Sequence, residues 1–162
     1  MGNLFGYANI SFNQVFFNVV TYSHGMMGYG EPDAPHIYLA PDVDNATLGK
    51  ALRQAMKLSK KVSVEEFQKI WHSGVVPKKA KEQAEYAIKT YGFKNHRTMV
   101  KKMDSCSFCI VEGQIEIQAA HHYALNNYTY EVEPFYVSIN VSDEELGAAI
   151  RVGFSQCTSK LK

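Results

Sequence analysis

Two stretches of this chain, 98 residues apart, share one pattern of hydrophobic and polar positions. Residues 36–59 read HIYLAPDVDNATLGKALRQAMKLS, and residues 134–157 read PFYVSINVSDEELGAAIRVGFSQC. Each copy begins with a short apolar segment and continues through polar capping residues into an amphipathic segment, which predicts a strand–cap–helix unit used twice. Neither copy holds a phosphate-binding loop or a set of metal ligands, so the unit indicates a scaffold. Identical residues match at Tyr38 and Tyr136, Val43 and Val141, Leu48 and Leu146, Gly49 and Gly147, Ala51 and Ala149, and Arg53 and Arg151.

Other segments predict further strands. Residues 9–22 alternate and are rich in β-branched and aromatic side chains, which predicts one strand or a bent pair. Residues 105–111 and 114–120 flank Glu112-Gly113, a turn signal that predicts an antiparallel hairpin. Residues 37–40 and 134–140 predict two short strands, residues 23–35 an exposed Gly- and Pro-rich loop, and residues 121–129 a polar, aromatic loop or strand end.

Capping signals predict the helices. One helix starts at Asp44 or Asn45 and runs to about residue 59, and a short one follows the capping box of Ser63 and Glu66. Further helices are predicted at 78–91, ended by Gly92, at 95–102, and from Ser142 to about 157. This order predicts an α+β fold, with helices packed on a mainly antiparallel sheet. No linker-like stretch divides the chain, so we interpret residues 1–162 as a single domain.

Composition narrows the class of protein. The 46% hydrophobic and 20% charged content is typical of a globular chain. No apolar run approaches the roughly 20 residues that span a bilayer. The start, MGNLFGYANISF, lacks the basic and long apolar regions of a secretory signal, so we expect a cytoplasmic protein with reduced cysteines.

Charge is segregated along the chain, although the net charge is +1. Residues 50–102 hold 14 Lys and Arg against 4 Asp and Glu, whereas residues 1–49 hold 4 acidic and no basic residues. The basic centre, with Trp71 and Tyr86 among its lysines, is one candidate for binding nucleic acid. It carries no recognised nucleic-acid motif, and Lys-rich helices commonly just present a solvated face.

Residues 106–109 read CSFC, and His121-His122 lies beyond the predicted hairpin. Thiolates and imidazoles are the ligands that zinc prefers, so these four side chains are a candidate metal site. In a strand, however, Cys106 and Cys109 point to opposite faces, and such a cysteine is commonly a small buried hydrophobic residue. No Ser/His/Asp or Cys/His catalytic set can be assembled from the spacing. We therefore expect no enzymatic activity, no cofactor and no metal.

Acidic residues gather around both copies of the repeat. Asp44 and residues 143–145 stand where they stabilise helix N-termini. The acidic residues without a capping role are the better candidates for contacting a basic protein, which an acidic rim would attract. These candidates are Glu31, Asp33, Glu131 and Glu133. Tyrosines in predicted loops are candidate anchors for the same partner, with ordinary packing against the sheet edge as the alternative. They are Tyr29, Tyr123, Tyr128 and Tyr130.

The segment VSDEELGAAIR (residues 141–151), after the predicted strand FYVSIN, resembles the C-terminal segment of a bacterial immunity protein family from contact-dependent growth inhibition systems. Residues 91–122 are similar to that family in the order of an aromatic-Gly turn, a basic helix and a hairpin. The resemblance covers roughly residues 35–157. It implies a cytoplasmic antidote that binds and occludes the C-terminal toxin domain, often a nuclease, of an effector delivered by neighbouring cells. It implies no catalytic residues, no membrane and no direct nucleic-acid contact, and it leaves the oligomeric state open.

Overall fold

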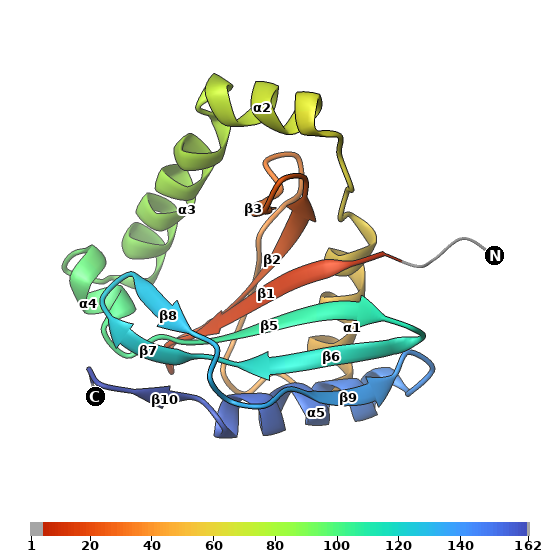
Figure 1. Cartoon of the computed structure of the whole chain (residues 1–162). Coiled ribbons are helices and arrows are strands. Elements are labelled where there is room, and N and C mark those ends of the chain that lie inside the picture. The colour runs from red at the N-terminus through yellow and green to blue at the C-terminus, as the bar shows by residue number, and fades with distance from the viewer. Residues whose placement is uncertain (1–4, 162) are drawn as a thin grey trace.

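The computed structural model describes residues 5–161 and shows a mostly antiparallel sheet with helices packed on it (Figure 1). The sheet contains β1 (Tyr7–Phe12), β2 (Phe17–His24), β3 (Gly28–Gly30), β4 (Ile37–Leu39), β5 (Asp104–Val111), β6 (Gln114–Ala119) and β9 (Phe135–Ser138). Its order is β3-β2-β1-β5-β6-β9, and β4 pairs with the end of β2 that β3 leaves free. These observations confirm the predicted α+β class.

The helices are α1 (Asn45–Lys57), α2 (Val64–Ser73), α3 (Val75–Tyr91), α4 (His96–Val100) and α5 (Asp143–Ser155). The predicted caps hold: Asp44, Ser63 and Ser142 accept backbone N–H groups in the first turns of α1, α2 and α5. The predicted start of α3 at residue 78 is wrong. Gly74, at a φ of 77°, ends α2 and α3 begins at Val75, so Pro77 sits in the first turn, where no N–H is needed.

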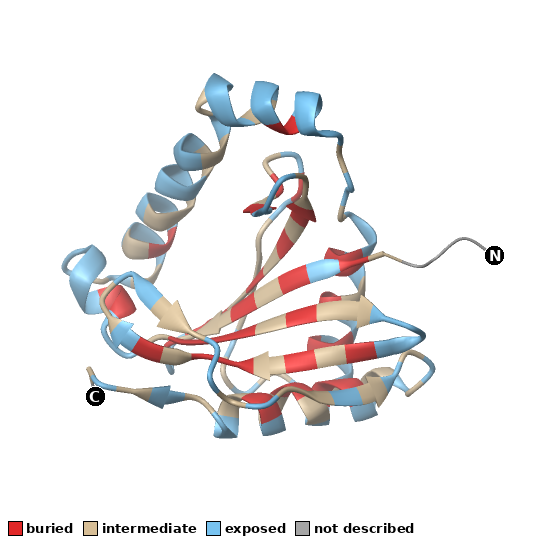
Figure 2. Ribbon diagram, in the orientation of Figure 1, coloured by how far each residue is buried: buried red, intermediate tan, exposed pale blue. Residues whose placement is uncertain are grey.

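One face of the sheet is covered by α1 and α5, and the main core lies between these layers. Figure 2 shows the buried positions alternating along β1 and β6, and along β5 after its buried first residues. A second, smaller cluster around Phe16 and Ala87 attaches α3 and α4 to the sheet. The main core is formed by Ala8, Ile10, Phe17, Val19, Leu48, Leu52, Phe108, Ile115, Ile117, Leu146 and Ile150 with their neighbours.

The two helices of the sequence repeat, α1 and α5, lie against each other. Gly49 and Gly147 stand at the contact, where a side chain would meet the partner helix: a Cβ on Gly147 would lie 1.9 Å from the Asn45 carbonyl oxygen. A Cβ on Gly49 would lie 2.1 Å from the corresponding oxygen of Asp143. Each helix therefore needs glycine at this position for the other to approach.

One segment predicted as a loop, and another predicted as a loop or strand end, contain strands. Within residues 23–35, β3 returns alongside β2, which runs on to His24. Within residues 121–129, β7 (His121–Ala124) and β8 (Asn127–Thr129) form a hairpin. The strand β10 (Thr158–Ser159) pairs with β7 in parallel and completes a small second sheet. The partners of β10 are distant in the chain, so no local pattern predicts this pairing.

Candidate functional site

The face of the main sheet opposite α1 and α5 carries polar and aromatic side chains. The strand register aligns five of them into one row that crosses β2, β1, β5, β6 and β9 in turn. We call these residues the tyrosine row: Tyr22, Tyr7, Cys109, Glu116 and Tyr136.

Glu116 organises its end of the tyrosine row. The Tyr136 hydroxyl donates to one carboxylate oxygen at 2.9 Å, and the Cys109 thiol donates to the other at 3.6 Å. The hydrogen bond to Glu116 raises the pKa of Tyr136, and burial, with the nearby Glu116 charge, raises the pKa of Cys109 to about 12. Burial likewise raises the pKa of Tyr7. These groups stay protonated at neutral pH and present hydroxyl and thiol groups around a carboxylate.

The segment that leads into β9 is held beside the tyrosine row. The Gln118 side chain, on β6, donates from Nε2 to the carbonyl oxygens of Tyr130 at 3.4 Å and Val132 at 3.1 Å. Glu131 lies between these two anchored residues, and both it and Glu133 are exposed. Tyr130 is 48% exposed and Tyr136 is 46% exposed. We call Tyr130, Glu131, Glu133, Glu116 and Tyr136 the acidic tyrosine surface.

A cavity of about 300 Å³ opens beside this surface. Asn9 and Ser11 of β1 form its polar floor, and Tyr22 and Tyr130 contribute aromatic walls. Tyr128 also lines the cavity, but its hydroxyl donates to the Met103 carbonyl at 3.0 Å and its ring stacks on His122. These contacts hold the half-buried Tyr128 against β7 and the end of the α4 segment. Tyr123, on β7, is 43% exposed.

The structure separates the predicted acidic residues. Glu31 and Asp33 follow β3 at one end of the sheet, and Glu131 and Glu133 precede β9 at the other, so the four do not form one rim. Glu31 is only 4% exposed and accepts hydrogen bonds from the Ser23 hydroxyl and the Asp33 backbone. Asp33 pairs with Lys60 at 3.1 Å. The expectation that Glu31 is available to a partner is wrong, because its carboxylate closes the β3 turn.

Tyr29 is also misplaced by the sequence prediction. It lies in β3 rather than a loop, is 2% exposed, and packs edge-on against Phe67 of α2. Sequence reasoning missed Tyr7, Glu116 and Tyr136. Glu116 and Tyr136 lie within predicted strands and Tyr7 lies just before one, but only the strand order brings the three into one row.

The cysteine and histidine cluster is dispersed. Cys106 is buried in the main core, whereas Cys109 faces the opposite side of the sheet beside Glu116. His121 bonds to Thr158, and His122 is buried with Nε2 near the Leu125 carbonyl. Residues 5–161 contain no group of three or more His, Cys, Asp or Glu side chains arranged to hold a metal ion.

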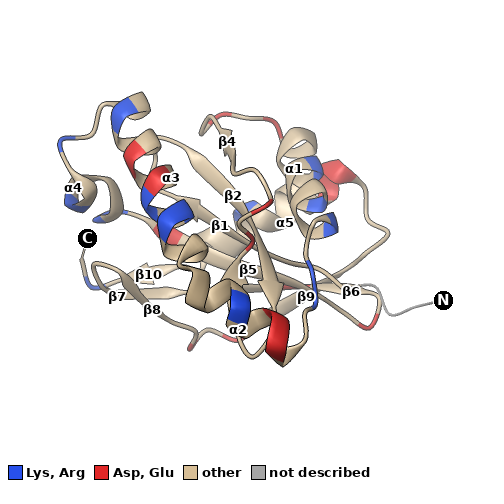
Figure 3. Ribbon diagram, turned by 90° about the horizontal axis from the view of Figure 1, so that it is seen from above, with Lys and Arg blue, Asp and Glu red and all other residues tan. Residues whose placement is uncertain are grey.

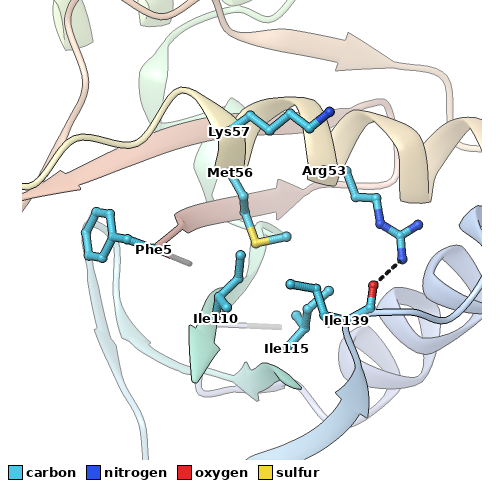
Figure 4. Close-up of a pocket in the computed structure, with 7 residues that line it drawn as sticks. All are labelled: Phe5, Arg53, Met56, Lys57, Ile110, Ile115 and Ile139. Carbon is cyan, nitrogen blue, oxygen red and sulfur yellow. Dashed lines mark hydrogen bonds between the residues drawn. The ribbon is translucent and has the colours of Figure 1, made fainter. Parts of the chain in front are cut away.

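A second cavity, of about 350 Å³, lies on the helical side of the sheet (Figure 4). Its wall is apolar, formed by Met56 with isoleucines from β5, β6 and the loop after β9. Arg53 lies at its margin and donates to the Ile139 carbonyl at 3.1 Å. Basic residues concentrate elsewhere, on α3, on α4 and just after α4 (Figure 3), at Lys78, Lys79, Lys81, Lys89, Arg97, Lys101 and Lys102. No helix in the described part of the chain is long and apolar enough to cross a membrane.

Comparison with known proteins identifies relatives along nearly the whole chain. Residues 6–157 match the family described as CdiI, CDI immunity protein. The immunity protein CdiI-YPIII of Yersinia pseudotuberculosis serotype O:3 is 26% identical, over 93% of this chain and 94% of that protein. A Neisseria meningitidis protein of unknown function has a similar fold, with a TM-score of 0.89 and 22% identity over 97% of this chain and 98% of its own. A chain of a CdiA-CT/CdiI toxin and immunity complex from Yersinia pseudotuberculosis gives a TM-score of 0.84 and 22% identity, covering 95% and 98%.

Proposed function

Because this chain belongs to the CDI immunity protein family, we propose that it binds and blocks the toxin domain of a cognate contact-dependent growth inhibition effector. The fold match to a chain from a toxin and immunity complex supports this role. Proteins of this family are toxin inhibitors, so neutralisation proceeds by occupying the toxin and not by turnover. The site of action is the cytoplasm of the protected cell.

The toxin domain binds at the acidic tyrosine surface, and the exposed tyrosines and carboxylates of this surface are the observation that supports the choice. Exposed tyrosines supply large contact areas with few rotatable bonds, and such residues are enriched among interface anchors. Glu131 and Glu133 stand at its margin and add negative charge without an ion-pair partner among the described residues. The surface therefore suits a partner with a positively charged face.

A positively charged active-site face is typical of enzymes that bind the phosphates of nucleic acid. The cognate toxin is accordingly a nuclease, which this chain neutralises by steric and electrostatic occlusion. The acidic carboxylates attract the same cationic side chains that would hold phosphate groups. Asp33 and Tyr123, which remain exposed, lie outside the acidic tyrosine surface and form secondary candidates for contact.

Charge reversal tests this surface. We expect Glu131→Lys with Glu133→Lys to lower the association rate with the cognate toxin domain by about tenfold or more, because electrostatic steering acts on the encounter. Surface plasmon resonance at several salt concentrations measures this association rate. The matched control is Glu82→Lys with Glu85→Lys, which reverses two exposed charges on α3.

The two double variants carry the same net charge, so they separate a local from a global effect. Equal rates for both variants would show that the toxin binds elsewhere. Retained protection against the toxin in a growth assay would then still support the immunity function itself.

A further inference from the structure

Two cysteines distant in the sequence meet at the edge of the main core. The Sγ atoms of Cys106, in β5, and Cys157, just after the C-cap of α5, lie 3.6 Å apart. Both thiols are free. The third cysteine, Cys109, lies on the other face of the sheet and bonds to Glu116. The partner of Cys106 is therefore not the cysteine of its C-x-x-C motif.

The surroundings hold the two sulfur atoms in contact. The Cys157 thiol also lies 3.4 Å from the Ser105 carbonyl oxygen and 3.8 Å from that of Gly153. A Cβ on Gly153 would lie 2.9 Å from Ile117 and 3.5 Å from the Cys106 sulfur, so glycine keeps this space open. Closing a disulfide to about 2.05 Å needs a sulfur movement of only about 1.5 Å.

The hydrogen bond between the thiols makes them chemically unequal. It raises the pKa of Cys106, which burial raises further, and it lowers the pKa of Cys157. Cys157 is half-buried, whereas Cys106 is fully buried. The more accessible sulfur thus has the greater thiolate character, which is the property that decides reaction with oxidants.

We propose that Cys106 and Cys157 are a modification site, at which a peroxide oxidises the thiol pair to an intramolecular disulfide. The Cys157 thiolate attacks one peroxide oxygen, the O–O bond breaks, and Cys157 becomes a sulfenic acid with release of the first water after protonation. The Cys106 sulfur then attacks the Cys157 sulfur, the S–O bond breaks, and hydroxide leaves with the Cys106 proton as the second water. Two thiols and one hydrogen peroxide give one disulfide and two waters.

The disulfide would join β5 to the end of α5, where the chain enters β10. Because β10 pairs with β7, the bond also fixes the small sheet beside Tyr128 and Tyr130. It closes a loop between residues 51 apart, so we expect oxidation to raise Tm by roughly 5–10 °C. This inference stands independently of the proposed function.

Peptide mapping tests the pairing directly. Trypsin cuts after Lys102, Arg151 and Lys160, so residues 103–151 hold Cys106 and Cys109, whereas residues 152–160 hold Cys157. The Cys109→Ser variant removes the ambiguity between the first two. After treatment with hydrogen peroxide and blocking of free thiols, non-reducing mass spectrometry should find the two peptides linked, at about 2 Da below their summed mass.

Recovery of both cysteines as blocked thiols, or as unlinked sulfinic acids, would overturn the proposal. Cys157→Ser and Cys157→Ala should lose both the linked peptide and the rise in Tm, whereas Cys109→Ser should keep both. A rise in Tm that persists without Cys157 would also contradict it. Mapping in the Cys109→Ser background decides the question even where the Cys157 variants fold poorly.

Discussion

Glycine at two equivalent positions, Gly49 and Gly147, lets α1 and α5 lie close enough for side chains of one helix to reach the loop before the other. A methyl group on either would overlap a backbone oxygen of the opposite helix. Backbone cannot move aside as a flexible side chain can, so the overlap must separate the helices. The repeated Leu-Gly dipeptide is thus a packing requirement.

We expect Gly147→Ala to lower the free energy of unfolding by about 3 kcal/mol, because it overpacks a rigid contact. Urea denaturation followed by circular dichroism measures the change. Gly30→Ala is the control: its Cβ would meet nothing within 4 Å, so it should cost far less. Equal losses for the two variants would mean that the helix contact is not the tight point of the fold.

Single residues show where sequence reasoning works at this scale. Asp44 and Ser142 are local capping signals, and the structure places them as predicted. Glu31 and Tyr29 were misjudged because burial depends on what covers a turn, and α2 and the Lys60 segment that cover it come from later in the chain. A short-range sequence pattern carries no information about which later segments bury the turn.

Arg53 of α1 and Arg151 of α5 hold the two helices together reciprocally. Arg53 donates to the Asp143 carboxylate at 2.5 Å and to the carbonyls of Ile139 and Val141. Arg151 donates to the Asn45 side chain at 2.8 Å and to the carbonyls at positions 41 and 43. Every acceptor in one set lies 98 residues from its equivalent in the other, so the repeat in sequence is a pseudo-twofold pair in space.

Arg53→Met and Arg151→Met should each lower the free energy of unfolding by about 1–3 kcal/mol, since partly buried acceptors lose their donors. The loss of unfolding free energy in the double variant should differ from the sum of the two single losses, because both arginines act on one helix contact. Chemical denaturation of the four proteins in this cycle measures the coupling. The control Lys50→Met changes an exposed residue of α1 and should alter the free energy of unfolding by no more than about 0.5 kcal/mol. If the losses of the two arginine variants were strictly additive, the two sets of hydrogen bonds would act separately.

The strands and helices were predicted well where neighbouring residues set them, as in the hairpin of β5 and β6, with Glu112 and Gly113 at positive φ. The small sheet of β7, β8 and β10 was not predicted. The pairing between β7 and β10 is parallel and joins the segment after the β5–β6 hairpin to the segment after α5. The tyrosine row depends on the same kind of long-range register, so the candidate site could be foreseen only in its Tyr130 to Glu133 part.

At the scale of the molecule, two cores join a sheet layer to two groups of helices. The main core unites the sheet with α1 and α5, and the smaller one attaches α3 and α4. His36 lies where α3 meets the edge of the sheet: its Nδ1 is 3.3 Å from the Asn18 amide nitrogen. Burial, aided by the nearby Lys79 charge, lowers the pKa of His36 to about 4.

Acid should therefore weaken this attachment before general acid unfolding. In the unfolded chain His36 takes up a proton near pH 6.5, whereas in the folded state it does so only near pH 4, so stability falls as pH falls through that window. Urea denaturation between pH 7 and pH 5 should show this loss, and His36→Gln should show less of it. His72→Gln, at an exposed position on α2, should follow the unmodified protein; parallel curves for all three would exclude a contribution from His36.

The reciprocal contact between α1 and α5 also determines when the chain can fold during its synthesis. The ribosome adds residues at about 5–20 per second, so the stretch from Lys57 to Asp143 takes on the order of 4–17 seconds to make. During that interval the apolar side of α1 has no α5 to cover it, and the main core cannot close. A cell thus gains a working molecule only when synthesis has passed α5, and a nascent chain halted earlier exposes a surface that chaperones and proteases recognise.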